Sequence, residues 1–170
     1  MQSSDNMMPD AETRLEARPG EHRAELRLWL RMLTCTTLIE TEVRSRLRER
    51  FDVTLPRFDL MAQLERAPEG LTLGDLSRRM MVSNGNITGL VERLVDSGHI
   101  VRAPHATDRR IMFVRLTNAG RAAFADMAAA HAQWIADLFS EVAPADQATL
   151  LGLLGRLKQS VRAGGQGGAA

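Results

Sequence analysis

A change of hydrophobic period near residue 100 constrains the fold of this chain more than any other feature of its sequence. Before that point, residues 84–97 carry apolar side chains at the spacing of an amphipathic helix, namely Ile87, Leu90, Val91, Leu94 and Val95. After it, residues 100–102 and 111–116 are short runs rich in β-branched and apolar residues, separated by a charged segment. This order predicts a helix followed by a two-stranded ribbon with a long charged tip.

The remainder of the chain shows mostly helical spacing, and capping or breaking residues mark the expected ends of its helices. Six helices are expected: residues 21–50, Pro56 to before Pro68, from the cap Thr72 to Met80, from the cap Ser83 to the stop at Gly98, from the cap Thr117, and from Pro144. Residues 1–20 and 164–170 lack this spacing and are expected to be disordered tails. The predicted fold class is therefore mainly α with a small β-wing.

Composition excludes several classes of protein. The 170 residues suffice for about one domain, and no apolar run approaches the ~20 residues that span a bilayer. The polar N-terminus shows no secretory signal, and a single cysteine rules out an internal disulfide framework and a cysteine-based zinc site. The four histidines form no i, i+4 pair, so no metal site is expected. We expect a cytoplasmic protein without a cofactor.

The order of helix, short helix, turn, amphipathic helix and charged hairpin predicts a winged helix-turn-helix. A helix of this kind fits the DNA major groove. The candidate contacts on residues 83–93 are Ser83, Asn84, Gly85, Asn86, Thr88, Gly89 and Arg93. The helix N-terminus favours a phosphate, Asn86 can pair with an adenine edge, and Thr88 can meet a phosphate or a thymine methyl group. The alternative is a capped helix with an ordinary solvated face.

The wing tip adds a second candidate DNA contact. Residues 72–115 hold seven arginines and four acidic residues, a net charge of +3. At the tip, Asp108 can orient Arg110 through a bidentate pair, next to Arg109, so that the guanidinium enters a narrow minor groove. The alternative is a solvated cluster of charges.

These residues together resemble the MarR family of bacterial winged-helix regulators. The matching segments are LGDLSRRM (73–80), VSNGNITGLVERLVDSGHIVR (82–102), DRR (108–110) and LTNAG (116–120). The resemblance implies a homodimer that binds a pseudo-palindromic operator in double-stranded DNA. It also implies a dimerisation helix over 21–54, a DNA-binding domain over 55–117 and dimerisation helices over 118–163. Arg110 matches the family's minor-groove arginine and Asp108 its brace, whereas Gly89 departs from the larger or charged residue often found there.

The resemblance further implies an effector cleft between the dimer helices and the DNA-binding lobe. On this chain its border is expected at Trp29, Met32, Leu33, Phe58, Met61, His131 and Trp134, although ordinary core packing explains the same spacing. Residues 44–60 resemble a branch that regulates aromatic-acid catabolism, including members that respond to hydroxycinnamoyl-CoA thioesters. Arg46 and Arg57 can supply cations for a carboxylate or CoA phosphates. The alternative is neutralisation by Glu40, Glu42 and Glu49.

The expected function is that of a regulator, in the usual case a repressor, released by a small aromatic acid or aromatic acyl-CoA. An enzyme is not expected, because Ser83 has no histidine or aspartate at a suggestive spacing and no glycine-rich phosphate loop is present. One alternative is a winged helix used for protein contacts. Another is a redox sensor acting through Cys35, but a buried structural cysteine is the expectation there.

Overall fold

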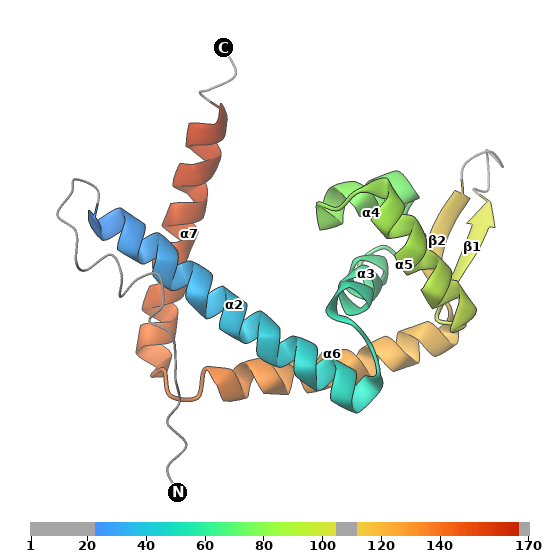
Figure 1. Ribbon diagram of the computed structural model, residues 1–170, viewed down its shortest axis with the longest axis horizontal. Helices are drawn as coiled ribbons and strands as arrows, with labels where there is room; N and C mark the ends of the chain where they lie inside the picture. The colour runs from blue at the N-terminus through green and yellow to red at the C-terminus, as the bar shows by residue number, and fades with distance from the viewer. Residues whose placement is uncertain (1–22, 105–111, 167–170) are drawn as a thin grey trace, which may run out of the picture. The chain divides into compact units, whose positions relative to one another are not determined.

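The computed structural model describes residues 23–104 and 112–166, and the chain divides after residue 132 into two compact units (Figure 1). The first unit contains six complete elements: α2 (Arg23–Phe51), α3 (Leu55–Glu65), α4 (Leu73–Met80), α5 (Asn84–Asp96), β1 (Ile100–Pro104) and β2 (Met112–Leu116). Helix α6 (Asn118–Leu138) begins in the first unit and ends in the second, which also holds α7 (Pro144–Gln166). The expected fold class, mainly α with a small β-wing, is confirmed.

Helices α3, α4 and α5 pack together with the β1–β2 ribbon around one apolar core (Figure 1). The side chains that are almost fully buried there are Leu60, Met61, Leu64, Leu76, Ile87, Val91, Leu94, Ile100 and Val114. Most of the apolar stripe expected on residues 84–97 faces this core, while Val95 is exposed at its edge. Burial of one face of α5 leaves its opposite face to solvent.

The helix ends follow the capping residues that the sequence indicates. The Thr72 side chain accepts a hydrogen bond from the Asp75 N–H and begins α4, and Ser83 does the same for α5 by accepting from the Asn86 N–H. Helix α5 ends at Asp96 with Ser97 as its C-cap, and the next residue, Gly98, has a φ of +73°, a left-handed conformation that other residues adopt at a cost. These local signals therefore place the two helices of the helix-turn-helix.

The ribbon is larger than the sequence indicates. Strands β1 and β2 pair antiparallel from Ile100↔Leu116 to Pro104↔Met112, so β1 extends two residues beyond the expected end at residue 102. The backbone of β2 supplies partners for these extra residues, and a proline is tolerated at the end of a two-stranded ribbon. Leu71 forms a further β-bridge with Val114. The Leu71 N–H donates to the Val114 carbonyl at 3.0 Å, and the Leu71 carbonyl accepts from the Val114 N–H at 2.8 Å.

The C-terminal helix is longer than the sequence predicts. Helix α7 continues to Gln166, so residues 164–166, expected in the tail, are helical. Glycine is tolerated in a last helical turn, where the cost relative to alanine is about 1 kcal/mol. The expected tail over 1–20 and the residues 167–170 lie outside the described residues.

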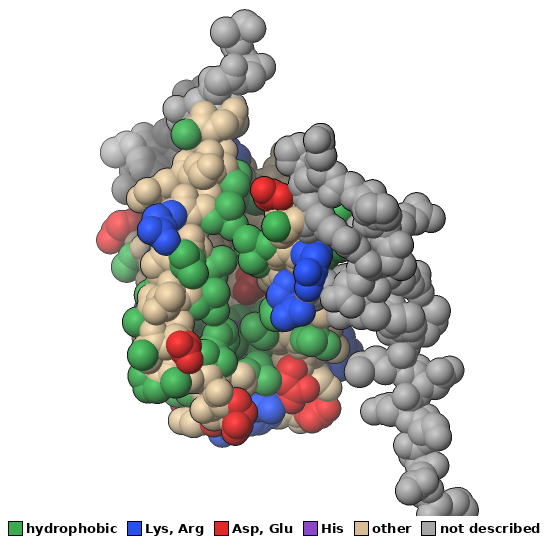
Figure 2. Space-filling view, turned by 90° about the vertical axis from the view of Figure 1, so that its left-hand side faces the viewer, with side chains coloured by type: hydrophobic (Ala, Val, Ile, Leu, Met, Phe, Trp, Pro, Cys, Tyr) green, Lys and Arg blue, Asp and Glu red, His purple; other side chains and the backbone are tan. Residues whose placement is uncertain are grey.

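Apolar side chains on α2 and α7 are exposed to solvent in this single chain. On the first half of α2 they are Leu26, Leu28, Trp29, Leu33 and Leu38, and on α7 they are Leu150, Leu151, Leu153, Leu154, Leu157 and Val161. Figure 2 shows hydrophobic side chains gathered on one face of the surface. The first half of α2 is therefore not buried within the single chain.

Cys35 is also exposed, so the expectation of a buried structural cysteine is wrong for this chain. The reason is its place in the first half of α2, where the described elements of the first unit leave the helix face that carries it exposed. The described residues contain no helix long and apolar enough to cross a membrane. They contain no group of three or more histidine, cysteine or acidic side chains that could hold a metal ion either.

Candidate nucleic-acid interface and adjacent cavity

The outward face of α5 presents most of the predicted DNA contacts to solvent. Ser83, Asn84, Gly85, Asn86 and Arg93 are exposed, and Thr88 and Gly89 are partly exposed. The Thr88 hydroxyl donates a hydrogen bond to the Asn84 carbonyl at 3.0 Å, so its proton is used within the helix. This face therefore combines two exposed amide side chains, one cation and a helix N-terminus, which suit base edges and phosphates.

Two glycines on α5 are not required by the packing of the described chain. A Cβ atom placed on Gly85 or Gly89 would meet nothing within 4 Å. Because glycine in a helix interior costs about 1 kcal/mol relative to alanine, their presence has no internal explanation here. An approaching partner whose surface comes close to the helix backbone supplies one.

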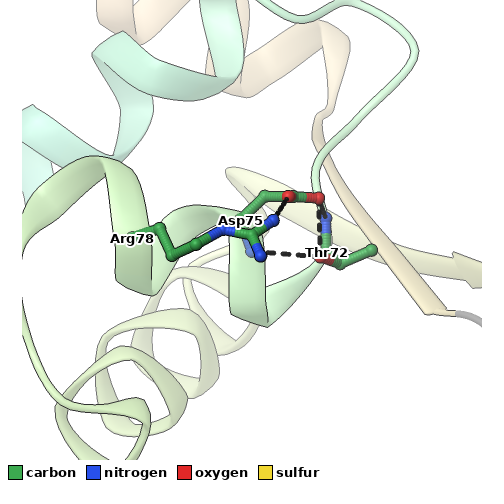
Figure 3. A network of polar contacts seen from close by, with 3 residues as sticks. All are labelled: Thr72, Asp75 and Arg78. Atoms are coloured by element: carbon green, nitrogen blue, oxygen red, sulfur yellow. Dashed lines mark hydrogen bonds and ion pairs between the residues drawn. The ribbon is translucent and has the colours of Figure 1, made fainter.

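Asp75 joins the start of α4 to an arginine on its last turn (Figure 3). Its carboxylate accepts from the Thr72 hydroxyl at 2.7 Å and from the Thr72 N–H at 3.3 Å, while its other oxygen accepts from the Arg78 guanidinium. The hydrogen bonds from Thr72, together with the Arg78 charge, hold the pKa of Asp75 below its usual value. The sequence analysis recognised Thr72 as a cap but missed Asp75, although an acid three residues after the cap is the capping-box spacing.

A cavity of about 660 Å³ lies between α3, the first part of α6 and the turn that joins α4 to α5. Aromatic, charged, polar and small apolar side chains line the cavity, namely Pro56, Phe58, Asp59, Ala62, Gln63, Arg66, Arg79, Met80, Val82, Phe124, Ala128 and His131. The Phe58 ring lies 5.5 Å from the Phe124 ring and 5.0 Å from the His131 ring, measured between centroids. The volume is in the range of roughly 300–1,000 Å³ typical of small-molecule sites.

Two of the nine predicted effector residues, Phe58 and His131, line this cavity. Met61 is completely buried in the core instead, and Trp134 is buried on the part of α6 that belongs to the second unit. On α2, Trp29 and Leu33 are exposed and Met32 is half-buried. The sequence analysis missed four lining residues that matter chemically, namely Asp59, Arg66, Arg79 and Phe124. Of these four residues, only Phe124 could have been predicted from the sequence, because its helical spacing places it on the same face of the helix as His131.

The surroundings of Asp59 disfavour the charged form of its carboxyl group. Partial burial and the nearby Glu40 carboxylate raise the pKa of Asp59, and the positive charge of His131 acts in the opposite direction. The cavity therefore contains an acidic group that is held less strongly in its charged form than an exposed aspartate.

Two of the four arginines on the second half of α2 are paired with neighbouring acids. Arg46 Nε lies 2.7 Å from Glu42 Oε1, and Arg44 lies 3.8 Å from Glu40. Arg57 differs, because its half-buried side chain has a buried Nε with no hydrogen-bond partner among the described residues. Of the two cations predicted for a carboxylate or phosphate, Arg46 already has an acid beside it and Arg57 retains an unused donor.

The wing-tip prediction lies outside the described residues, so Asp108, Arg109 and Arg110 have no place in this geometry and their roles remain predictions. Two arginines on the strands are described and exposed, Arg102 on β1 and Arg115 on β2. The base of the wing thus carries part of the positive charge of residues 72–115.

Comparison with known proteins identifies the family. The family model described as "MarR family" matches residues 51–111. A solved MarR family transcriptional regulator from Silicibacter pomeroyi is 32% identical, with a TM-score of 0.72 over 85% of this chain and 99% of that one. This chain belongs to the MarR family. MarR from E. coli in its apo form shares the fold, with a TM-score of 0.68 and 24% identity over 74% of this chain and 93% of that one.

Two curated relatives carry functional names. The transcriptional activatory protein BadR of Rhodopseudomonas palustris is 33% identical over 97 residues, which are 56% of this chain and 55% of BadR. The HTH-type transcriptional regulator PecS of Dickeya dadantii is 25% identical over 129 residues, 75% of this chain and 78% of PecS. The match therefore spans only about half of BadR. Both names describe transcriptional regulators, as the MarR-family assignment does for this chain.

Proposed function

We propose that this MarR-family protein is a homodimeric DNA-binding repressor that a small aromatic acid or aromatic acyl-CoA releases from its operator. The observation that carries the DNA-binding part is the outward face of α5. That face exposes Asn84, Asn86 and Arg93 and has two glycines, Gly85 and Gly89, that internal packing does not require. A helix with these features fits a major groove whose wall and phosphates approach its backbone closely.

The exposed apolar faces of α2 and α7 support the homodimer. Their leucines and Trp29 are spaced as on helices that pack against other helices, yet the single chain leaves them in water. An exposed row of apolar side chains along a helix, as each of these two helices has, marks a protein contact. Two lobes related by a two-fold axis then read a pseudo-palindromic operator whose half-sites lie about one helical turn, ~10 bp, apart.

The cavity beside the helix-turn-helix supports an aromatic effector. The Phe58, Phe124 and His131 rings provide an aromatic wall, and Arg66 and Arg79 provide cations. Arg57, one of the two cations predicted from the sequence, is not among the residues that line this cavity. The name of BadR describes an activator, so the direction of regulation is part of the test below.

A gel-shift titration on the DNA flanking the protein's own gene tests this proposal. It uses excess non-specific competitor, two salt concentrations, and lanes with and without 4-hydroxybenzoate or 4-hydroxycinnamoyl-CoA. We expect a specific shift that weakens steeply with salt and that one of the two compounds releases. Absence of a specific shift at low salt would contradict DNA binding and favour a protein-interaction module. A reporter fusion gives the sign of regulation.

The wing-tip prediction is tested by Arg110→Ala in the same titration. We expect weaker operator binding, because one contact to the minor groove is lost. Arg156→Ala on α7 removes the same charge outside the winged helix and serves as the matched control. Equal affinity of the Arg110 variant and wild type would show that the tip does not contact DNA.

A further inference from the structure

The turn of the helix-turn-helix forms one wall of the cavity. Arg79 and Met80 on the last turn of α4 and Val82 in the turn itself all line it. The next residue, Ser83, is the N-cap of α5. A ligand in the cavity therefore contacts the residue directly before the start of the helix that we propose reads DNA.

Hydrogen bonds make this turn a defined structure. The Ser77 hydroxyl donates to the Val82 carbonyl at 2.6 Å, and the Val82 N–H donates to the Ser77 carbonyl at 3.2 Å. Met81 adopts a left-handed conformation with φ of +55°, and its N–H also donates to the Ser77 carbonyl. A ligand that displaces Val82 or Arg79 consequently also displaces the N-terminus of α5, because the hydrogen-bonded turn between them is short.

Arg78 and Arg79 are neighbours with different surroundings. Arg78 is paired with Asp75 and does not line the cavity, whereas Arg79 lines the cavity and makes no hydrogen bond or ion pair with the described residues. Arg79 is also exposed. The first helix of a helix-turn-helix crosses the DNA backbone, so an exposed arginine on the last turn of α4 can reach a phosphate.

We propose that Arg79 is shared between two anions, a DNA phosphate in the operator complex and the carboxylate of an aromatic acid bound in the cavity. This inference rests on the proposed function and names the ligand class and the residue through which that ligand acts. The aromatic ring packs against Phe58 and Phe124, and Arg79, with Arg66, holds the carboxylate through charge-assisted hydrogen bonds. An Arg79 side chain that turns into the cavity to hold the carboxylate no longer extends toward the DNA backbone, so ligand and DNA compete for this residue.

The cavity also selects the charge of its ligand. Asp59 contributes a third charged group beside the two arginines, so a monocarboxylate is favoured over a dicarboxylate. An acyl-CoA lacks the free carboxylate, because the thioester has replaced it. Of the two effector types in the proposed function, we therefore assign the free acid to this site, because only the acid has a carboxylate attached to the aromatic ring for Arg79 to hold.

Calorimetry without DNA tests the ligand part, with 4-hydroxybenzoate, 4-hydroxybenzamide and 4-hydroxybenzoyl-CoA as probes. We expect wild type to bind the acid in preference to both the neutral amide and the thioester. Arg79→Gln is expected to lower affinity for the acid at least about 10-fold, in line with loss of a charge-assisted contact. Arg78→Gln removes the neighbouring charge outside the cavity and is expected to bind the acid as wild type does.

Gel shifts with the operator DNA test the shared role. Arg79→Gln is expected to reduce the dependence of log affinity on log salt by about one, and to weaken release by 4-hydroxybenzoate. Wild-type affinities for acid and DNA are expected to decrease each other by the same factor, because binding linkage is reciprocal. Ala128→Phe fills the cavity from α6 and is expected to keep DNA binding but lose release by the acid.

The outcomes separate this inference from the proposed function. If wild type binds no DNA specifically, the proposed function fails. If wild type binds DNA but Arg79→Gln retains wild-type affinity for both acid and operator, the shared role of Arg79 is wrong. Preferential binding of the thioester or the amide would overturn the ligand class while leaving the regulator intact.

Discussion

Gly120 lies so close to the backbone of His99 that no side chain fits between the two residues. A Cβ atom on Gly120 would lie 1.8 Å from the His99 carbonyl oxygen and 2.8 Å from its carbonyl carbon. Thr117 reinforces this junction: its hydroxyl donates to the Gly98 carbonyl at 2.7 Å and accepts from the Gly120 N–H at 2.9 Å, and its N–H donates to the His99 carbonyl at 3.0 Å. The start of α6 is thereby attached to the turn that follows α5.

Gly120→Ala is expected to destabilise the protein by about 1–3 kcal/mol or more, because the added methyl group overlaps backbone atoms that cannot move without breaking these hydrogen bonds. Urea denaturation followed by circular dichroism measures the change. A midpoint equal to that of wild type would show that the junction adapts freely.

Gly89→Ala is expected to have the opposite effect on stability. The added methyl group meets nothing within 4 Å, and alanine in a helix interior is favoured over glycine by about 1 kcal/mol, so the urea midpoint should increase. Under the proposed function the same methyl group should weaken operator binding, because it keeps the DNA away from the α5 backbone. Increased stability together with unchanged operator affinity would remove close approach as the explanation for this glycine.

Asp75→Asn is expected to reduce stability at neutral pH and to have little effect in acid. The folded-state pKa of Asp75 is depressed, so its carboxylate contributes stability above the unfolded-state pKa, near 3.8, and that contribution is lost as pH falls through the folded-state value. Denaturation of variant and wild type at pH 7 and at several values below pH 4 measures the difference. A difference that stays constant across this range would mean that the charge of Asp75 is not what stabilises α4.

Leu151→Glu tests the homodimer. Leu151 is 74% exposed in the single chain, so a monomer would tolerate the change with little effect on stability. In a dimer formed through α7, two glutamates would enter an apolar interface and the protein should dissociate into monomers. Light scattering after size-exclusion chromatography measures the mass. Thr149→Glu, on the same helix but not one of its exposed apolar residues, is the control.

Local signals in the sequence determined the helix-turn-helix, because caps and apolar spacing act over three to eight residues. Thr72 and Ser83 cap their helices through their own side chains, and Gly98 adopts a positive φ because it has no Cβ atom, as the sequence predicts. The apolar stripe on α5 similarly predicts which face of the helix is buried, since an amphipathic helix turns its apolar face toward the core in any fold.

The tertiary structure decided which residues share the cavity. Phe58, Arg79 and Phe124 lie on three helices, so no spacing along the chain relates them. The same holds for the exposure of Cys35 and for the contact of Gly120 with His99, which depend on how elements pack and not on local propensity. Periodicity shows that a side chain is on the apolar face of its helix, but only the packing of the helices shows whether that side chain meets a core, a cavity or water.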